Sequence, residues 1–368
     1  MNKLVALMFL LHVSSSILDN LQPNQNNNPG RQPRSKRISQ NNYSNTTSDG
    51  QDQDQKGYFP DGNGCVSPGL LNHPKSNLTT RCGSGKTKPE EFVTFTYYNR
   101  KNNATHGVTF SLNSSAKVLV EIDNGKPLKL ITHGWLNDGL SEICQRIKNS
   151  YLKTRDVSVI VIDWGCVAHS HWYFTPLESI ESIAQYCAKV IEKIVDNGMN
   201  PKNIHLIGYS LGAHLSGTIS LILKMHMKIT IARVTGLDPS LPMIEHLKYR
   251  LDQTCADFVD VIHTSGGFFG IKDAIGHADF YPNGGVIPQP RCKGILEIFS
   301  ACSHAESWKL FEESIEVFTE YSKCDSWTNF QLGKCNKTQM VPFGDPAPSH
   351  ARGCYYLDTT NIHQNKLL

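Results

Sequence analysis

Ser210 stands between two glycines in the run Gly208-Tyr209-Ser210-Leu211-Gly212, a setting in which a serine can act as a nucleophile. Apolar and β-branched residues lead into Gly208, and apolar residues continue at helical spacing after Gly212. The pattern predicts a strand, a tight turn and a helix, with the serine in a strained conformation that lifts its hydroxyl clear of the sheet. An ordinary turn serine would show the same motif, so the interpretation depends on residues that would activate the hydroxyl.

A serine hydroxyl is a weak nucleophile at neutral pH and needs a general base, which in turn needs a carboxylate to orient it. In hydrolases built on a parallel sheet, the acid and then the histidine follow the serine along the chain. Asp238 directly follows the apolar run 229–237 and is the candidate acid, although Asp238-Pro239 is also a common turn dipeptide. His304 is the candidate base, because it follows Cys302 and precedes apolar residues at helical spacing. The other histidines after the candidate acid are expected to be structural or exposed: His246, His263, His277, His350 and His363.

An acyl-transfer site also needs two backbone N–H groups to stabilise the negative oxygen of the intermediate. One is expected from the residue after the nucleophile, Leu211. The other is expected from a loop at the carboxyl end of an earlier strand, and His133-Gly134-Trp135 is such a loop. The Trp135 amide is therefore the second candidate. Its indole ring can at the same time be an aromatic plug in the core, which does not conflict with this role.

These residues need a sheet that holds them at one edge. Apolar residues recur at helical spacing around residues 141–152, over 180–197 and after the serine turn, which predicts helices. Strands that alternate with helices indicate an α/β fold with a largely parallel sheet covered on both faces. The predicted strands are residues 92–98, 116–122, 128–132, 157–164, 203–208, 229–237 and 258–263.

Composition limits the class of protein. The chain has 368 residues, 39% of them hydrophobic, and a formal net charge of +3, without the basic stripe that a nucleic-acid partner would require. Lys3 and the apolar run 4–13 predict a secretory signal over residues 1–16, and no later segment is long and apolar enough to cross a membrane. Eleven cysteines without paired C-x-x-C spacing favour disulfides over a zinc site. The protein is therefore predicted to be secreted and extracellular.

Residues 17–56 are rich in Asn, Gln, Ser and Asp, which predicts a disordered segment. The run Arg34-Ser35-Lys36-Arg37 within it is either a furin-like cleavage site, with the cut after Arg37, or a solvated basic cluster. One folded domain is predicted over residues 57–368. Candidate N-glycosylation sites, expected in surface loops, are Asn42, Asn45, Asn77, Asn103, Asn113 and Asn336.

Further runs complete a pattern with those around Trp135 and Ser210. They are Gly236-Leu237-Asp238-Pro239, Asp260-Val261-Ile262-His263-Thr264, Gly276-His277-Ala278-Asp279-Phe280-Tyr281-Pro282-Asn283-Gly284-Gly285 and Cys302-Ser303-His304. In this order they resemble the pancreatic lipase family, from about residue 57 to the end of the chain, and look most like its arthropod members related to venom phospholipase A1. The resemblance implies a single-domain α/β-hydrolase fold, a triad of Ser210, Asp238 and His304, and an oxyanion hole formed by the Trp135 and Leu211 amides.

Four features differ from the vertebrate pancreatic pattern, and the first three concern length. The chain ends soon after Leu357, so we expect no C-terminal β-sandwich domain and no colipase, which binds that domain in the digestive relatives. Only residues 293–301 lie between Cys292 and Cys302, where the family has its disulfide-closed lid. The loop 264–275 is also short. In the family, short versions of this loop and of the lid accompany phospholipase activity.

The predicted lid is apolar, which suits contact with a lipid surface, although a purely structural hairpin would have the same composition. Its residues are Cys292, Ile295, Leu296, Ile298, Phe299 and Cys302.

Residues 250–255 correspond to a structural calcium site in the pancreatic enzymes. Here Asp252 remains, but Cys255 takes the place of a second aspartate. A thiol is a poor ligand for a cation that prefers oxygen. We therefore expect no metal and no cofactor.

Two pairs of cysteines are close enough in sequence to form disulfides, Cys292 with Cys302 and Cys324 with Cys335. The family resemblance implies a third, Cys65 with Cys144. The remaining cysteines are odd in number, so one thiol is expected to be free or intermolecular. They are Cys82, Cys166, Cys187, Cys255 and Cys354.

The sequence thus predicts a secreted, monomeric carboxyl-ester hydrolase that acts on lipid at a membrane or droplet surface. A phospholipase A1, which releases the fatty acid from the first acyl position through an acyl-enzyme, is the preferred function. Hydrolysis of triacylglycerol or galactolipid is the alternative within the same chemistry. A catalytically inactive lipid-binding or yolk-type storage protein is the alternative from another class, and the presence of all three triad candidates argues against it.

Overall fold

The computed structural model describes residues 88–101, 106–292, 301–335 and 339–360. Contacts divide the chain into two units, Met1–Gly62 and Asn63–Leu368, and the described residues all lie in the second. The predicted signal at 1–16, the segment 17–56 and the cleavage point after Arg37 lie outside the described residues. Among the helices that are described, none has the length and apolar character needed to cross a membrane.

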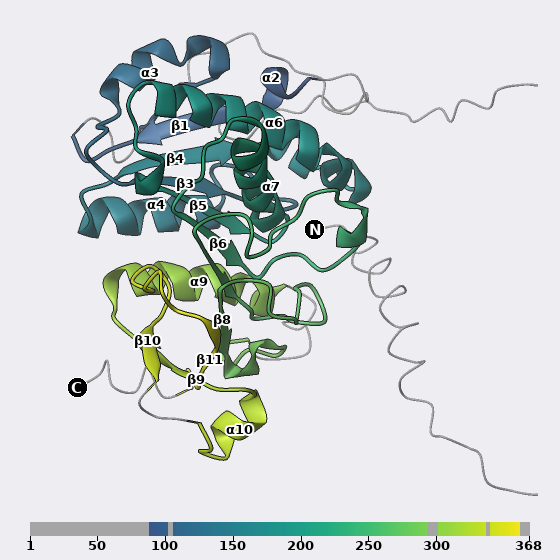
Figure 1. Cartoon of the computed structure of the whole chain (residues 1–368). Helices are drawn as coiled ribbons and strands as arrows, with labels where there is room; N and C mark the ends of the chain where they lie inside the picture. Colours follow the sequence, from purple (N-terminus) through teal and green to yellow (C-terminus); the bar gives the residue numbers. More distant parts are fainter. Residues whose placement is uncertain (1–87, 102–105, 293–300, 336–338, 361–368) are drawn as a thin grey trace, which may run out of the picture. The chain divides into compact units, whose positions relative to one another are not determined.

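One sheet of eleven strands organises this part of the chain (Figure 1). The strands are β1 (Thr94–Tyr98), β2 (Val108–Phe110), β3 (Leu128–Thr132), β4 (Ser158–Asp163), β5 (Ile204–Tyr209), β6 (Arg233–Leu237), β7 (Phe258–Ile262), β8 (Ala278–Pro282), β9 (Glu320–Lys323), β10 (Met340–Pro342) and β11 (Gly353–Leu357). Their order across the sheet is β10-β9-β11-β8-β7-β6-β5-β3-β4-β1-β2. The strands from β11 to β4 run parallel, and antiparallel strands extend the sheet at both ends.

Helices cover both faces of the sheet. The α-helices are α2 (Pro89–Phe92), α3 (Ala116–Glu121), α4 (Glu142–Thr154), α5 (Gly165–Ala168), α6 (Phe174–Asp196), α7 (Leu211–His226), α9 (Cys302–Glu316) and α10 (Trp327–Gln331), and the 3-10 turns are η2 (Leu112–Ser114), η3 (Pro201–Asn203), η4 (Ile244–His246) and η5 (Asn283–Gly285). Helices α6 and α7 pack on one face and α4 and α9 on the other (Figure 1). In β4, Ile160 and Ile162 face the first layer, whereas Val159 and Val161 face the second. A strand buried on both sides explains the continuous apolar runs in the sequence.

The strands predicted between residues 128 and 263 are confirmed as β3, β4, β5, β6 and β7, and the predicted helices as α4, α6 and α7. The strand predicted at residues 116–122 is wrong, because this segment forms α3. Val118 and Ile122, four residues apart, are buried, whereas Val120 between them is 84% exposed. One buried stripe at helical spacing suits a helix on the surface of the core. The β-branched residues favour a strand only locally, and packing overrides that preference.

The strand register brings the candidate residues to one edge of the sheet. Gly208 of β5 pairs with Thr132 of β3 on one side and with Gly236 of β6 on the other. Leu237 of β6 pairs in turn with Ile262 of β7. The residues that follow these strands therefore emerge together at the carboxyl ends of the parallel strands, where sites on such sheets form.

The cysteines form two of the three expected disulfides, Cys292–Cys302 and Cys324–Cys335. The pairing of Cys65 with Cys144 is wrong, because Cys144 is a free thiol. It lies on the inner side of α4, packed in the core against the sheet with no exposed surface, and burial raises the pKa of its thiol. Cys166 is disulfide-bonded instead.

Candidate active site

Ser210 forms the turn between β5 and α7. Its φ of 55° and ψ of −122° lie outside the regions that L-residues normally adopt. The turn is packed so tightly that a Cβ atom on Gly212 would lie 2.2 Å from the His133 carbonyl oxygen. A glycine is therefore required at this position, which accounts for part of the motif. The same contact places the loop after β3 directly against the serine turn.

Asp238 and His304 form a buried pair next to this turn. His304 Nδ1 lies 2.6 Å from Asp238 Oδ2, and the two residues are 7% and 0% exposed. The backbone of the serine turn is tied to the same region, because Ser210 N donates to Leu237 O at 2.9 Å and Ser240 N donates to Ser210 O at 3.3 Å. The structure thus places the candidate acid and histidine in contact and ties the serine turn to the segment that carries the acid.

The imidazole of His304 lies among aromatic rings. The ring of Tyr209 is 4.8 Å from it and that of Phe269 is 5.6 Å from it, measured between centroids. Burial, together with the charge of Asp238, raises the pKa of Tyr209, so its phenol stays neutral. Within the described part of the chain, the hydrogen bonds of the His304 ring all involve Nδ1. Nε2 therefore remains available to accept a proton.

Backbone and hydroxyl donors from the loop after β7 hold the Asp238 carboxylate. Oδ1 accepts from Thr264 N at 2.9 Å and from Ser265 N at 3.1 Å. Oδ2 accepts from the Ser265 hydroxyl as well as from His304. Gly270 from the same loop lies so close that a Cβ atom there would be 2.3 Å from Oδ1. Charge-assisted bonds of this kind fix the carboxylate in one orientation.

Sequence reasoning did not select Ser265 or Gly270. They lie in the loop that was singled out only for its length, and neither belongs to a local motif that marks a catalytic residue. The signal that would have found them is positional, because they follow the strand next to the one that carries Asp238.

A second buried pair, His263 and Asp279, lies at the start of this loop. His263 Nε2 is 2.8 Å from Asp279 Oδ1, and Nδ1 is 2.7 Å from Ile271 O. Both partners are acceptors, so the ring must carry both protons. Burial acts to lower the pKa of His263, but the hydrogen bond and charge of Asp279 outweigh it and raise this pKa. The resulting imidazolium ties the far end of the loop, at Ile271, to its beginning.

The loop that carries the predicted oxyanion residue Trp135 is anchored to the segment after β4. Trp135 Nε1 donates to Ser170 O at 2.7 Å, and Leu136 N donates to Ala168 O at 2.9 Å. The Trp135 ring is partly buried and meets Tyr173 edge to face at 5.1 Å. The indole ring therefore packs against the core, and this packing does not conflict with the role predicted for the Trp135 amide. Leu211, the other candidate, is the first residue of α7, where amides have no acceptor within the helix.

An ion pair further along the same loop adds to its anchoring. Asp138 Oδ2 lies 3.3 Å from His169 Nε2, and this bond lowers the pKa of Asp138 to about 2. The other carboxylate oxygen accepts from Leu140 N and from the Ser141 hydroxyl. The oxyanion loop is thus held at both ends, which suits a site that must present an amide in a fixed direction.

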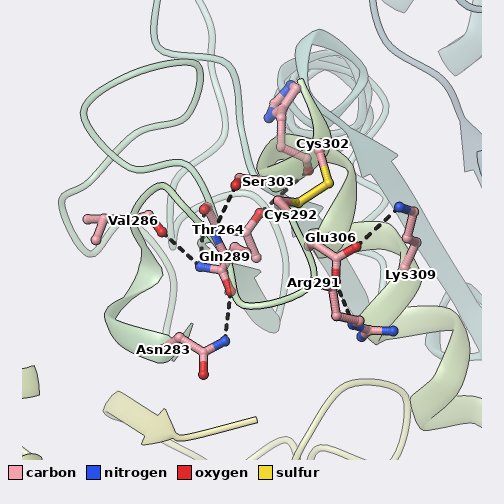
Figure 2. Close-up of a disulfide and its surroundings, with 11 residues drawn as sticks. Thr264, Asn283, Val286, Gln289, Arg291, Cys292, Cys302, Ser303, Glu306 and Lys309 are labelled. Atoms are coloured by element: carbon pink, nitrogen blue, oxygen red, sulfur yellow. Dashed lines mark hydrogen bonds and ion pairs between the residues drawn. A yellow bond between two sulfur atoms is a disulfide. The ribbon is translucent and has the colours of Figure 1, made fainter. Parts of the chain in front are cut away.

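The two ends of the predicted lid are joined by the Cys292–Cys302 disulfide, shown in Figure 2. Beside it, the buried side chain of Gln289 donates to Thr264 O and Val286 O and accepts from Asn283. Gln289 N donates to the Ser303 hydroxyl, next to His304. Gln289 thus connects the base of the lid with the acid loop and with α9. The lid residues Ile295, Leu296, Ile298 and Phe299 lie outside the described residues.

The Glu306 carboxylate, buried below the disulfide, bonds to Arg291 at 2.7 Å and to Lys309 at 3.1 Å (Figure 2). Cys292, Cys302 and Glu306 are the one group in the described part of the chain with metal-ligand spacing. The two sulfurs are bonded to each other, so they do not offer the thiolates that a metal would need.

In residues 250–255, the segment that resembles a calcium site, the Asp252 side chain bonds to a residue of its own turn. Its Oδ1 accepts from Thr254 N at 2.7 Å, and the Cys255 thiol is buried, which raises its pKa to about 12. The expectation that calcium does not bind stays a prediction.

Of the glycosylation candidates, Asn113 is exposed in η2, and Asn42, Asn45, Asn77, Asn103 and Asn336 lie outside the described residues.

A serine turn, a carboxylate and a histidine at the carboxyl edge of a mostly parallel sheet, with helices on both faces, define an α/β hydrolase. Comparison with protein families matches residues 70–346 to the family described as Lipase. The chain belongs to this lipase family, and its relatives place it with the pancreatic lipases.

Among curated proteins, the chain is 34% identical to lipase member H-B of Xenopus laevis over 226 residues, 59% of this chain and 48% of that protein. It is 32% identical to human pancreatic triacylglycerol lipase over 266 residues, 63% of this chain and 56% of that protein. The chain thus spans about half the length of the curated relatives it matches. Among solved structures, Est1E from Butyrivibrio proteoclasticus, with ferulic acid bound, matches with a TM-score of 0.29 and 12% identity, over 46% of this chain and 74% of that one.

Proposed function

We propose that this protein hydrolyses carboxylic esters of lipids through an acyl-enzyme on Ser210, and that phospholipid, cleaved at the first acyl position, is its preferred substrate. The observation that carries the proposal is the buried 2.6 Å contact between His304 Nδ1 and Asp238 Oδ2, next to the strained turn of Ser210. Membership of the lipase family supports the same chemistry.

In the first half of the reaction, Ser210 Oγ attacks the ester carbonyl carbon while its proton passes to His304 Nε2. Asp238 accepts the Nδ1 proton in a hydrogen bond, so the imidazolium is stabilised where it forms. The carbonyl electron pair moves to the oxygen, and the Trp135 and Leu211 amides are assigned to receive this charge. When the tetrahedral intermediate collapses, the ester C–O bond breaks and the leaving alcohol oxygen takes the proton from His304.

In the second half, water replaces the alcohol. His304 removes a proton from the water as its oxygen attacks the acyl carbon, and the second tetrahedral intermediate releases the fatty acid as Ser210 Oγ regains a proton. The ester, one water molecule and these side chains balance the two steps.

The choice of phospholipid rests on the short lid and the short loop 264–275. The Cys292–Cys302 disulfide, with a sequence separation of 10, closes a lid of only a few residues. Triacylglycerol is the second candidate, since the human relative that matches over 266 residues is named for that substrate.

We also propose that the protein is secreted and acts as a monomer, without colipase, at a membrane or droplet surface. Two disulfides in the described part of the chain favour an oxidising compartment.

The test is labelling with a serine-directed fluorophosphonate, followed by a panel of phospholipid, triacylglycerol and galactolipid with the released acyl position identified. Wild type should label and hydrolyse, and Ser210→Ala should do neither while unfolding at the same temperature. Absence of labelling in wild type would support an inactive lipid-binding protein. Labelling that survives Ser210→Ala would refute the nucleophile, and hydrolysis confined to triacylglycerol would refute the preferred substrate alone.

A further inference from the structure

Ser265 contacts both members of the acid–base pair. Its hydroxyl donates to Asp238 Oδ2 and lies 3.3 Å from His304 Nδ1, while its amide donates to Asp238 Oδ1 at 3.1 Å. The residue has no exposed surface. A side chain in this position cannot meet the substrate, but it meets the two groups that would activate the nucleophile.

The chemistry of the hydroxyl decides which contact is the bond. A serine hydroxyl has one proton to donate, and the nearby carboxylate is the stronger acceptor. Asp238 Oδ2 then accepts two protons, one from Ser265 and one from His304 Nδ1. The two donors share the negative charge of a single oxygen. Ser265 therefore affects both the direction of the carboxylate and the strength with which it attracts the imidazole proton.

Several contacts fix the loop that carries Ser265 where it meets Asp238. Thr264 N also donates to Asp238 Oδ1, and Gly270 lies against the same oxygen. The contact of His263 Nδ1 with Ile271 O closes the loop behind them. These contacts hold the backbone of Ser265, and the hydroxyl is only one bond away from its Cβ atom.

We propose that Ser265 is a positioning residue for the reaction proposed above. Its hydroxyl and its amide bond to the two oxygens of the Asp238 carboxylate and thereby fix the carboxylate toward His304 Nδ1. The inference rests on the proposed function, because it assigns Ser265 a role in the activation of Ser210.

The test uses the full secreted chain with Ser265 replaced by alanine or cysteine, and with turnover expressed per site labelled by the fluorophosphonate. We expect Ser265→Ala to lower kcat about tenfold, the equivalent of losing one hydrogen bond to a charged group, with little change in KM. Ser265→Cys has a side chain of similar size that is a weak hydrogen-bond donor, so its kcat should lie between those of wild type and Ser265→Ala.

The matched control is Ser216→Ala, which removes a buried hydroxyl of α7 that has no hydrogen-bond partner within the described part of the chain. It should leave kcat and KM unchanged. If Ser265→Ala does not fold, the cysteine variant decides by the same two measurements. A kcat per labelled site equal to that of wild type would overturn the inference, while an active wild type and an inactive Ser210→Ala would leave the proposed function standing. A wild type that neither labels nor hydrolyses would instead overturn the proposed function.

Discussion

Two Asp–His pairs in the described part of the chain, Asp238–His304 and Asp279–His263, are buried on both sides, and they differ in what the histidine does with its second nitrogen. In the Asp238–His304 pair, the hydrogen bonds of the imidazole within the described chain all involve Nδ1. In the Asp279–His263 pair, Nε2 meets the carboxylate and Nδ1 meets the Ile271 carbonyl oxygen. The distance between the carboxylate oxygen and the ring nitrogen is similar in the two pairs, at 2.6 and 2.8 Å. A carboxylate partner therefore does not by itself allow a histidine to act as a base. The other ring nitrogen must also be able to accept a proton.

The two pairs are connected through the loop that follows β7. One end of that loop gives Thr264 and Ser265 to the Asp238 carboxylate, and Ile271 at its other end is bonded to His263. Asp279 also accepts from Ile275 N and Gly276 N. The first pair is suited to move a proton, and the second is suited to hold the loop that orients the first. Substitution of each acid should separate these roles.

The largest effect is expected for Asp238→Asn. The amide cannot stabilise the imidazolium and favours the wrong tautomer, so turnover should fall by about 10⁴-fold. The fold should change little, because an asparagine carbonyl oxygen can still accept from Thr264 N and Ser265 N. Turnover per molecule of folded protein and thermal unfolding measure the two quantities. A variant that keeps more than a tenth of wild-type turnover would contradict the assignment of this acid.

Asp279→Asn should show the opposite balance. It leaves the buried His263 without its counter-charge, and breaking such a pair lowers the free energy of unfolding by about 3–5 kcal/mol. Turnover of the molecules that remain folded should fall far less than in Asp238→Asn. Urea unfolding and turnover per labelled site, measured on the same preparation, give both numbers. Equal stability in Asp279→Asn and wild type would show that this pair does not hold the loop.

The smallest effect is a dependence of stability on pH. The pKa of His263 is raised in the folded state, so its contribution to stability is complete below the unfolded pKa of about 6.5 and is lost as pH rises through the folded value. The free energy of unfolding should therefore fall with pH above about 6.5, with a slope of at most about 1.4 kcal/mol per pH unit from this group. In Asp279→Asn this alkaline slope should be smaller. Parallel curves for the two proteins between pH 6 and 9 would count against the His263 ion pair.

The part of the site that the sequence predicts is the part made by short segments. The turn at Ser210 is contiguous, and Asp238 follows from the order of strands. His304 had to be chosen from several histidines, and His263 was one of those set aside as structural or exposed. Ser265 and Gln289 were not predicted, because their partners Asp238 and Thr264 lie 27 and 25 residues away and only the register of the sheet brings them close.

The fold shows the same limit. Strands β3 to β7 were predicted because burial on both faces leaves continuous apolar runs. Strand β8 was not, since its Asp279 is polar and yet buried, and the bond from His263 is what makes that burial tolerable. For residues 116–121, local β-branching gave the wrong answer because tertiary packing selected a helix.

The backbone of Ser210 has a consequence for how such a protein can change over generations. A non-glycine residue at φ 55° and ψ −122° carries strain of about 1–3 kcal/mol, which glycine would largely relieve. A descendant that no longer needed the hydroxyl would gain stability by the single replacement of this serine. Selection for stability alone would therefore favour replacement of the proposed nucleophile and loss of activity. Only continued selection for the hydroxyl opposes that replacement.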